Sequence, residues 1–214
     1  MCGGPAKDAF VSAMSETYGT AGDSDGITFA GKTDPQIARR LLTGAGVEEE
    51  SIDEGFPELW KRYLEHLEVG LVDRPMQVLP GVRELLAALA SVDDVGLGLL
   101  TGNIAGGARL KLGSAGLWDH FGVGAYGSDH EERDELPAIV LARARSCWGS
   151  SVQAGDAVIV GDTPKDVACG RVGGTRTLAV ATGRYSVEEL EAAGADHVLR
   201  DLTATREVVS LLIA

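Results

Sequence analysis

The second half of the chain alternates short apolar runs with stretches of helical spacing, and this alternation constrains the fold more than any other feature. The apolar runs have the length of single strands and lie at 95–100, 121–126, 157–160, 177–180 and 197–199. Helices are predicted before the first run at 82–91 and between later runs at 105–113, 136–146 and 187–193. Continuous apolar strands separated by helices are typical of a parallel sheet that is covered on both faces. We therefore expect an α/β fold with a Rossmann-like, doubly wound parallel sheet.

The residues before Leu79-Pro80-Gly81 have another pattern, in which apolar side chains recur at three- and four-residue spacing. This spacing predicts helices at 6–18, 35–44 and 56–69. Asp34-Pro35 is a favourable helix start, since an N-cap residue precedes a proline in the first turn. Two regions follow from the change of pattern: residues 1–78 form a linker helix and a helical module, and residues 79–214 form the α/β core.

Composition excludes several classes of partner. The chain has 214 residues, a formal net charge of −13 and 5% aromatic residues, which disfavours binding to nucleic acid or to an anionic membrane. Cys2, Cys147 and Cys169 have no metal-binding spacing and are expected to be reduced thiols. Neither a signal-peptide core nor an apolar run of membrane-spanning length occurs. These features predict a soluble, acidic, cytoplasmic protein.

Thr101-Gly102-Asn103 follows the first apolar strand directly and precedes a helix. In an open α/β sheet, ligands bind beyond the carboxyl ends of the strands. A hydroxyl group and free backbone N–H groups at such a position can bind a phosphate oxygen. Thr and Asn are also favoured helix caps, so helix capping is the alternative interpretation of this loop.

The loop from Gly161 to Asp166 carries two carboxylates after another apolar strand. Asp162 ends the strand, and Asp166 follows four residues later, so both can face one cavity. Mg²⁺ prefers octahedral oxygen ligands and uses one or two carboxylates in proteins. Capping of a helix that begins at Pro164 is again the alternative.

A polar stretch lies between these two loops and contains Arg133. A cation beside bound phosphate and carboxylates would hold these charges together. Arg133 is therefore a candidate for the same site, with an exposed surface charge as the alternative. His130 lies in the same stretch, and we assign it no role, since a lone loop histidine is more often structural.

The runs Leu100-Thr101-Gly102-Asn103 and Val160-Gly161-Asp162-Thr163-Pro164-Lys165-Asp166 resemble motifs II and IV of the haloacid dehalogenase-like (HAD) hydrolases. Residues 79–86 and 181–198 are similar to the phosphoglycolate-phosphatase-like branch. This resemblance implies a HAD core with a helical cap. It also implies Mg²⁺-dependent hydrolysis of a small phosphorylated metabolite through an aspartyl-phosphate intermediate.

The resemblance also implies a role for each candidate residue. Thr101 would bind the phosphoryl oxygen, with Gly102 and Asn103 shaping the loop. Arg133 would replace the lysine that is usual in motif III of the family. Asp162 would be a Mg²⁺ ligand, and Asp166 would bind or orient the same ion.

Motif I of the family, an apolar strand that ends in Asp-x-Asp-Gly-Thr, has no counterpart in the chain. The run Asp23-Ser24-Asp25 follows a predicted helix, not an apolar strand, and is therefore a poor candidate for the nucleophile. We expect the nucleophile to lie upstream of Met1. In the family its strand lies between the strands that end at Thr101 and Gly161, so these would face a gap of about 9–10 Å unless they pair directly.

Other functions stay open at this point. A catalytically inactive HAD-fold protein could bind a phosphorylated ligand or partner, and a phosphomutase would share the core chemistry. A phosphonatase would need a Schiff-base lysine, for which Lys32 is a candidate, whereas a dehalogenase needs no metal and does not explain the acidic run after Gly161. Phosphoglycolate is the substrate that the branch suggests. The candidate contacts to the leaving group are Lys32, Thr33, Arg39 and Arg40.

Overall fold

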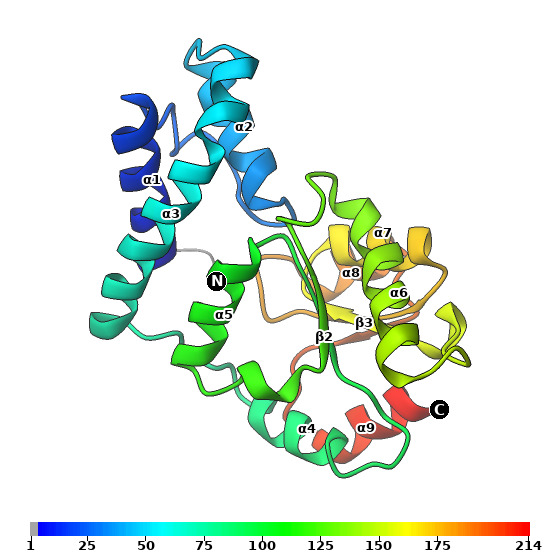
Figure 1. The fold of residues 1–214 in the computed structure, drawn as a ribbon. Coiled ribbons are helices and arrows are strands. Elements are labelled where there is room, and N and C mark those ends of the chain that lie inside the picture. Colours follow the sequence, from blue (N-terminus) through cyan, green and yellow to red (C-terminus); the bar gives the residue numbers. More distant parts are fainter. Residues whose placement is uncertain (1–3) are drawn as a thin grey trace.

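The computed structural model describes residues 4–214, and three helices form its first part (Figure 1). These helices are α1 (Pro5–Tyr18), α2 (Asp34–Gly44) and α3 (Glu49–Asp73), and we call them the helical module. Both α1 and α2 pack against α3 around one apolar cluster. The three helices confirm the helical prediction, but α3 begins before Phe56 and continues through Pro57. Its first turns are held by buried Ile52, whose carbonyl oxygen accepts a hydrogen bond of 2.7 Å from Tyr18 Oη.

The remaining residues alternate helices and strands, which confirms the α/β class. In chain order the elements are α4 (Val82–Leu89), β1 (Gly98–Thr101), α5 (Ala105–Ser114), β2 (Val123–Tyr126), α6 (Leu136–Trp148), β3 (Val158–Gly161), α7 (Pro164–Gly173), β4 (Arg176–Val180), α8 (Val187–Ala192), β5 (His197–Leu199) and α9 (Thr205–Ile213). The sequence analysis does not predict α9. It forms because Val208 is fully buried against Leu85 and Leu89 of α4 and Leu178 of β4.

The strands form two separate parallel sheets. One contains β1 and β2, with Gly98 opposite Val123 and Thr101 opposite Tyr126. The other has the order β3-β4-β5. The first strand is shorter than predicted because its neighbour begins only at Val123, so residues 95–97 have no strand beside them. Within residues 4–214, β1 and β3 do not pair, which excludes the direct pairing considered above.

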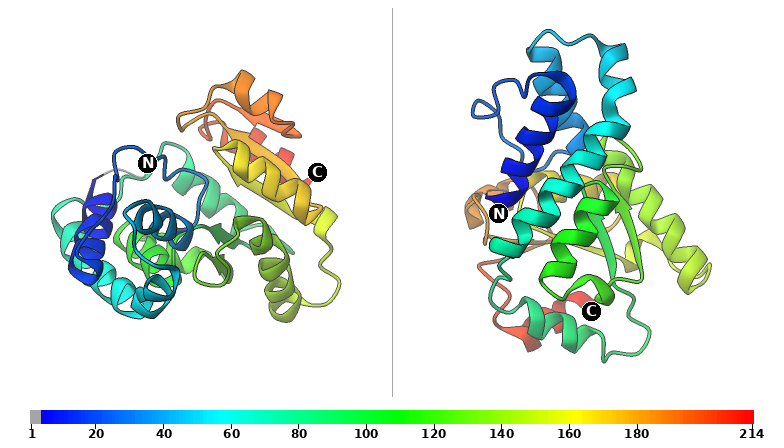
Figure 2. Two further views of the ribbon diagram at one scale, coloured as in Figure 1. Left: turned by 90° about the horizontal axis from the view of Figure 1, so that it is seen from above. Right: turned by 60° about the vertical axis from the view of Figure 1, so that its left-hand side comes forward.

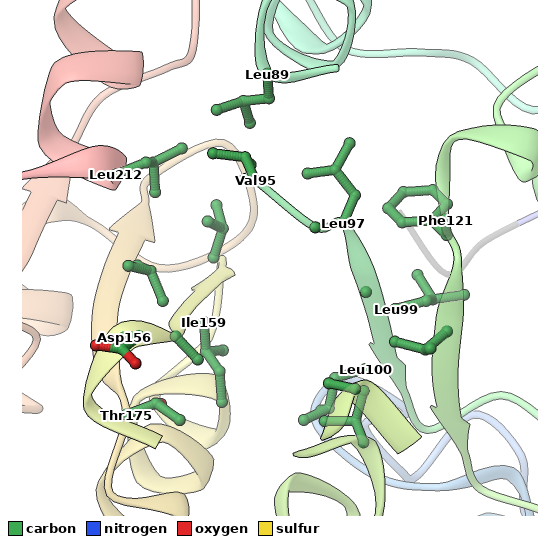
Figure 3. Close-up of a pocket in the computed structure, with 18 of the residues that line it drawn as sticks. Leu89, Val95, Leu97, Leu99, Leu100, Phe121, Asp156, Ile159, Thr175 and Leu212 are labelled. Carbon is green, nitrogen blue, oxygen red and sulfur yellow. The ribbon is translucent and has the colours of Figure 1, made fainter. Parts of the chain in front are cut away.

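An apolar slot separates the facing edges of β1 and β3. It has a volume of about 1450 Å³. Figure 3 shows Leu99 and Leu100 on one side of the slot and Ile159 on the other, with Leu89 and Leu212 nearby. Val160 of β3 is 42% exposed, an unusual value for a valine in the strand of a sheet core. Both strand edges therefore leave backbone N–H and C=O groups without a strand partner.

Helices, and not strand pairing, hold the two sheets together. Helix α6 contacts β1 and β2, helix α7 contacts β3 and β4, and the two helices contact each other. Figure 2 shows the helical module on one side of the molecule and β3-β4-β5 with α8 on the other. The loops after β1 and β3, where the candidate site was predicted, both lie against residues 31–32 of the module.

The described residues contain two of the three cysteines, and their helices can be compared with the length of a membrane span. Cys147 is an exposed free thiol and Cys169 a buried one, while Cys2 lies outside the described residues. Burial raises the pKa of Cys169, which keeps this thiol in its unreactive protonated form. None of the helices in the described part of the chain is long and apolar enough to cross a membrane.

Candidate functional site

The Thr101 loop turns sharply at the end of β1 and is held by side chains, not by a helix cap. Thr101 Oγ1 accepts hydrogen bonds from Asn103 N at 3.2 Å and from Asn103 Nδ2 at 2.8 Å. Lys111 donates in turn to Asn103 Oδ1. The N-cap of α5 is Ile104, without a side-chain cap. The capping alternative is therefore not realised here, and the hydroxyl hydrogen of Thr101 is free to bind an anion.

Two residues of the helical module lie directly on this loop. Asp34 N donates to Gly102 O at 2.7 Å, and Asp34 Oδ2 accepts from Ile104 N at 2.8 Å. The carbonyl oxygen of Lys32 lies so close to Gly102 that any Cβ there would overlap it. Burial raises the pKa of Asp34, while nearby Lys111 opposes this shift. The Thr101 loop is thus shaped by contacts with the module.

The Asp162 loop is built on the first turn of α7. Thr163 is the N-cap of this helix and forms a capping box with Asp166. The Oδ2 atom of Asp166 accepts from Thr163 Oγ1 at 2.8 Å, from Thr163 N at 3.0 Å and from Asp162 N at 3.2 Å. The capping alternative is thus realised by Thr163 and Asp166, and Asp162 is left with its side chain uncommitted.

Arg133 links the loop after β2 to the carboxylate of Asp166. Its guanidinium donates to Asp166 Oδ1, and the two side chains are only 13% and 11% exposed. The Nε of Arg133 is buried and has no hydrogen-bond partner. A buried donor without a partner costs free energy, so this guanidinium can take up an anion in addition to Asp166. The alternative that Arg133 is an ordinary surface charge is wrong.

Asp162 is the carboxylate that can bind a cation. It is half-buried, and within residues 4–214 it forms no ion pair. Burial and the neighbouring charge of Asp166 raise the pKa of Asp162. A divalent cation bound to Asp162 would offset both the loss of hydration of this carboxylate and its repulsion by Asp166. No group of three or more acidic, His or Cys side chains in the described range could hold a metal alone, so Mg²⁺ here would take Asp162, water and substrate oxygens as ligands.

One short segment of the module touches both loops. Gly31 lies against α7, since a Cβ at this residue would stand 2.8 Å from Lys165 Cγ and 3.7 Å from Thr163 Oγ1. The next residue, Lys32, lies against Gly102 as described above. Residues 31–32 therefore bring the Thr101 and Asp162 loops into one site.

Two other candidate residues of the module, Thr33 and Arg39, have structural partners. Thr33 is buried, caps α2 and donates to Glu131 O at 2.6 Å. Arg39 forms ion pairs with Glu49, Asp53 and Glu131. These bonds fix the module on the core and leave neither side chain free to contact a leaving group. His130 accepts a hydrogen bond from Glu132 N at Nδ1 and is exposed.

Comparison with known proteins gives concordant results. A family model described as HAD-hydrolase-like matches residues 137–205. Phosphoglycolate phosphatase of Rhodospirillum rubrum is 34% identical over 127 residues, which are 59% of this chain and 51% of the relative. The chain thus spans about half the length of the curated relative that it matches.

Solved structures extend the likeness to nearly the whole chain. A hydrolase from Pseudomonas syringae is 20% identical with a TM-score of 0.67, covering 97% of this chain and 93% of that one. CbbY from Rhodobacter sphaeroides in complex with phosphate is 17% identical with a TM-score of 0.69, covering 94% and 90%. At this identity the structures show a shared fold. Taken with the two sequence matches, they agree with the resemblance: this chain is similar to haloacid dehalogenase-like hydrolases, among them a phosphoglycolate phosphatase.

Proposed function

We propose that the chain forms the cap and most of the core of a Mg²⁺-dependent phosphomonoester phosphatase, similar to phosphoglycolate phosphatase. The observation that carries the proposal is the position of Thr101, Arg133 and Asp162 in the loops that follow β1, β2 and β3, with Arg133 paired to Asp166 of the Asp162 loop. It combines a free hydroxyl, a guanidinium with an unpartnered donor and an uncommitted carboxylate. The substrate is a small phosphorylated metabolite, and the protein acts in the cytoplasm.

Each residue has a distinct task in this proposal. The Thr101 hydroxyl donates to one phosphoryl oxygen, and the guanidinium of Arg133 donates to another while it keeps Asp166 in place. Asp162 would hold Mg²⁺, which neutralises charge on the phosphoryl group when bound. Asp166 keeps the loop rigid through its three hydrogen bonds to Asp162 and Thr163.

The nucleophile belongs in the slot between β1 and β3. An extended apolar segment there would pair with both free strand edges and cover Leu99, Leu100 and Ile159. If it runs parallel to its neighbours, its last residue lies at the same edge as Thr101 and Asp162. An aspartate at that position would attack phosphorus, and a second acid would protonate the leaving oxygen before water hydrolyses the aspartyl-phosphate.

The loop that carries Asp23 and Asp25 does not provide this aspartate. Asp25 forms an exposed ion pair with Lys7, and Asp23 Oδ1 accepts from Gly26 N. Both bonds are local to the helical module. The proposal therefore requires a segment from outside residues 4–214.

The test extends the chain at its N-terminus with the upstream codons of its gene or with a designed apolar strand of about five residues ending in Asp-Val-Asp-Gly-Thr. We expect Mg²⁺-dependent release of phosphate from p-nitrophenyl phosphate. Replacing the first aspartate of the added strand, or Asp162→Asn, should abolish it, whereas Asp23→Asn should leave it unchanged. Phosphate binding without turnover in the extended protein would favour the rival function, a non-catalytic protein that binds a phosphorylated ligand or partner.

A further inference from the structure

The hydroxyl group of Thr101 has a restricted direction, because both of its acceptor positions are occupied. A threonine hydroxyl accepts up to two hydrogen bonds and donates one. Thr101 Oγ1 accepts one bond from the backbone N–H of Asn103 and a second from Asn103 Nδ2. Within residues 4–214 this hydroxyl donates to no protein acceptor. Its hydrogen is therefore left to a ligand, and the two bonds from Asn103 restrict where it can point.

This direction depends on the orientation of the Asn103 side-chain amide. The two ends of an asparagine amide have nearly the same shape, but the carbonyl oxygen accepts hydrogen bonds and the NH₂ group donates them. In the structure the NH₂ group faces Thr101 Oγ1. If the amide were reversed, its carbonyl oxygen would face the hydroxyl, which would then donate to Asn103 and not to a ligand. The orientation of one amide thus decides whether Thr101 can donate to a phosphoryl oxygen.

Lys111 selects the orientation that leaves the hydroxyl free. Its ammonium group, on helix α5, donates to Asn103 Oδ1. An ammonium has three donors and no acceptor, so it can face only the oxygen end of the amide. Hydrogen bonds from a charged donor are also stronger than those between neutral groups. Within the described part of the chain, no other side chain donates to this oxygen, so the orientation depends on Lys111.

The helical module holds this ammonium group in place. Lys111 is partly buried, and its Nζ lies 5.7 Å from the centroid of the Tyr63 ring on α3. Asp34, which is buried at the start of α2, attracts the same charge, since Lys111 opposes the rise that burial causes in the pKa of Asp34. A surface lysine would instead extend its ammonium group into water. The position of Lys111 is therefore specified by the fold around it.

We propose that Lys111 is a positioning residue of the phosphoryl site: it fixes the amide of Asn103, which in turn fixes the Thr101 hydroxyl as a donor to phosphate. This inference rests on the proposed function, because a phosphoryl oxygen is the acceptor that the hydroxyl requires. It adds a residue that acts through two others and needs no contact with substrate or metal. Its effect differs from the attraction of phosphate by a positive charge, because it requires the hydroxyl of Thr101.

The first test uses the amide itself, since Asn103 is the only asparagine in the chain. Isotope-labelled asparagine therefore gives a single side-chain NH₂ pair in NMR spectra. The proton that donates to Thr101 Oγ1 should exchange with water about tenfold faster in Lys111→Met, which releases the amide. In Lys111→Arg, which can still donate to the amide oxygen, exchange should stay slow. An unchanged NH₂ pair in Lys111→Met would overturn the proposal whether or not the protein binds phosphate.

The second test is calorimetric titration of the full chain with inorganic phosphate in Mg²⁺ buffer. We expect Lys111→Met and Thr101→Val each to weaken phosphate binding about tenfold, because each removes the hydrogen bond from the hydroxyl to the anion. The double variant should bind no more weakly than Thr101→Val alone, since residues that act through one group are not additive. Lys111→Arg should retain most of the affinity. Arg109→Met, which removes an exposed charge from the same helix, is the matched control.

The outcomes separate the role of Lys111 from the proposed function. If Lys111→Met weakened binding equally in the Thr101→Val background, Lys111 would attract phosphate by its charge alone. The positioning role would then be wrong, and the phosphoryl site would stand. If the parent protein bound no phosphate, the phosphoryl site itself would be wrong, and the role of Lys111 with it.

Discussion

The two halves of the candidate site are built in different ways. The Asp162 loop is local: its N-cap, its capping box and its buried carboxylate all come from residues 162–166. The Thr101 loop depends on distant residues, since its shape requires Asp34 and the carbonyl oxygen of Lys32. A loop built by neighbours in sequence survives movement of the module, whereas a loop built by the module changes with it.

This difference has a functional consequence. Thr101 sits on the half that the module shapes, and Asp162 on the half that the module contacts through Gly31 but whose capping hydrogen bonds come from residues 162–166 alone. Motion of the module relative to the core would therefore alter the phosphate-binding half and leave the cation-binding half unchanged. Closure of one part over another is a common way for enzymes to complete a site.

The largest effect is expected from Arg133→Gln, which breaks the long-range ion pair of the local half. The variant leaves the buried Asp166 carboxylate without its cation, and breaking a buried ion pair costs about 3 kcal/mol. We expect this loss in the free energy of unfolding in urea, together with loss of phosphate binding in calorimetry.

Arg143→Gln is the matched control for this change. Its ion pair with Asp129 is more exposed, at 44% and 21%, and should contribute less than about 1 kcal/mol. If the two variants lost the same stability, Arg133 would be an ordinary surface charge and the argument for a buried anion site at this position would fail.

The next largest effect is expected from Gly102→Ala, which pushes the module away from the Thr101 loop. The added Cβ overlaps the backbone of Lys32, which cannot move like a flexible side chain, so we expect about 2 kcal/mol of destabilisation. Phosphate binding should weaken, while Mg²⁺ binding measured by calorimetry should persist. Gly113→Ala in α5 is the control, because a Cβ there meets nothing within 4 Å and alanine is the better helix former. Loss of Mg²⁺ binding in Gly102→Ala would contradict the independence of the two halves.

The same difference explains how far the sequence could predict the site. Asp162, Thr163 and Asp166 lie within one turn, so strand-end position and spacing were sufficient to place them together. The strand-helix alternation likewise predicted strands β1 to β5 and helices α4, α5, α6 and α8 within a few residues, whereas α7 entered only as the capping alternative for the acidic loop. Local sequence patterns of this kind predict local structure, because the residues that form it are neighbours in the chain.

What the sequence could not predict depends on contacts between distant residues. Asp34 shows only the features of a helix start, yet it bonds to Ile104, which is 70 positions away. Thr33 contacts Glu131 across 98 positions. The contacts of Arg184 with Thr28 and of Lys165 with Gly31 are equally non-local. A single sequence has no periodicity that indicates such pairs.

The smallest effect, a gain in stability, is expected from Asp162→Asn in the local half. Burial and Asp166 raise the pKa of Asp162 in the folded protein above its ordinary value of 3.8. The folded state therefore prefers the protonated acid, and this contribution is lost as the pH rises through the folded pKa. Because the group is half-exposed, the variant should be more stable than the parent by less than about 1 kcal/mol at pH 7, and equal to it below pH 3.8.

Asp129→Asn should have the opposite sign, because Arg143 lowers the pKa of Asp129 and its removal costs stability at pH 7. Urea unfolding of both variants between pH 3 and pH 8 measures the contrast. Mg²⁺ should increase the contrast: a cation bound at Asp162 stabilises the parent by RT ln(1 + [Mg²⁺]/Kd), and the variant gains nothing. If the Asp162→Asn protein were less stable than the parent at pH 7 without Mg²⁺, the Asp162 carboxylate would already have a favourable partner. Asp162 would then not be the free carboxylate that binds a cation in the local half.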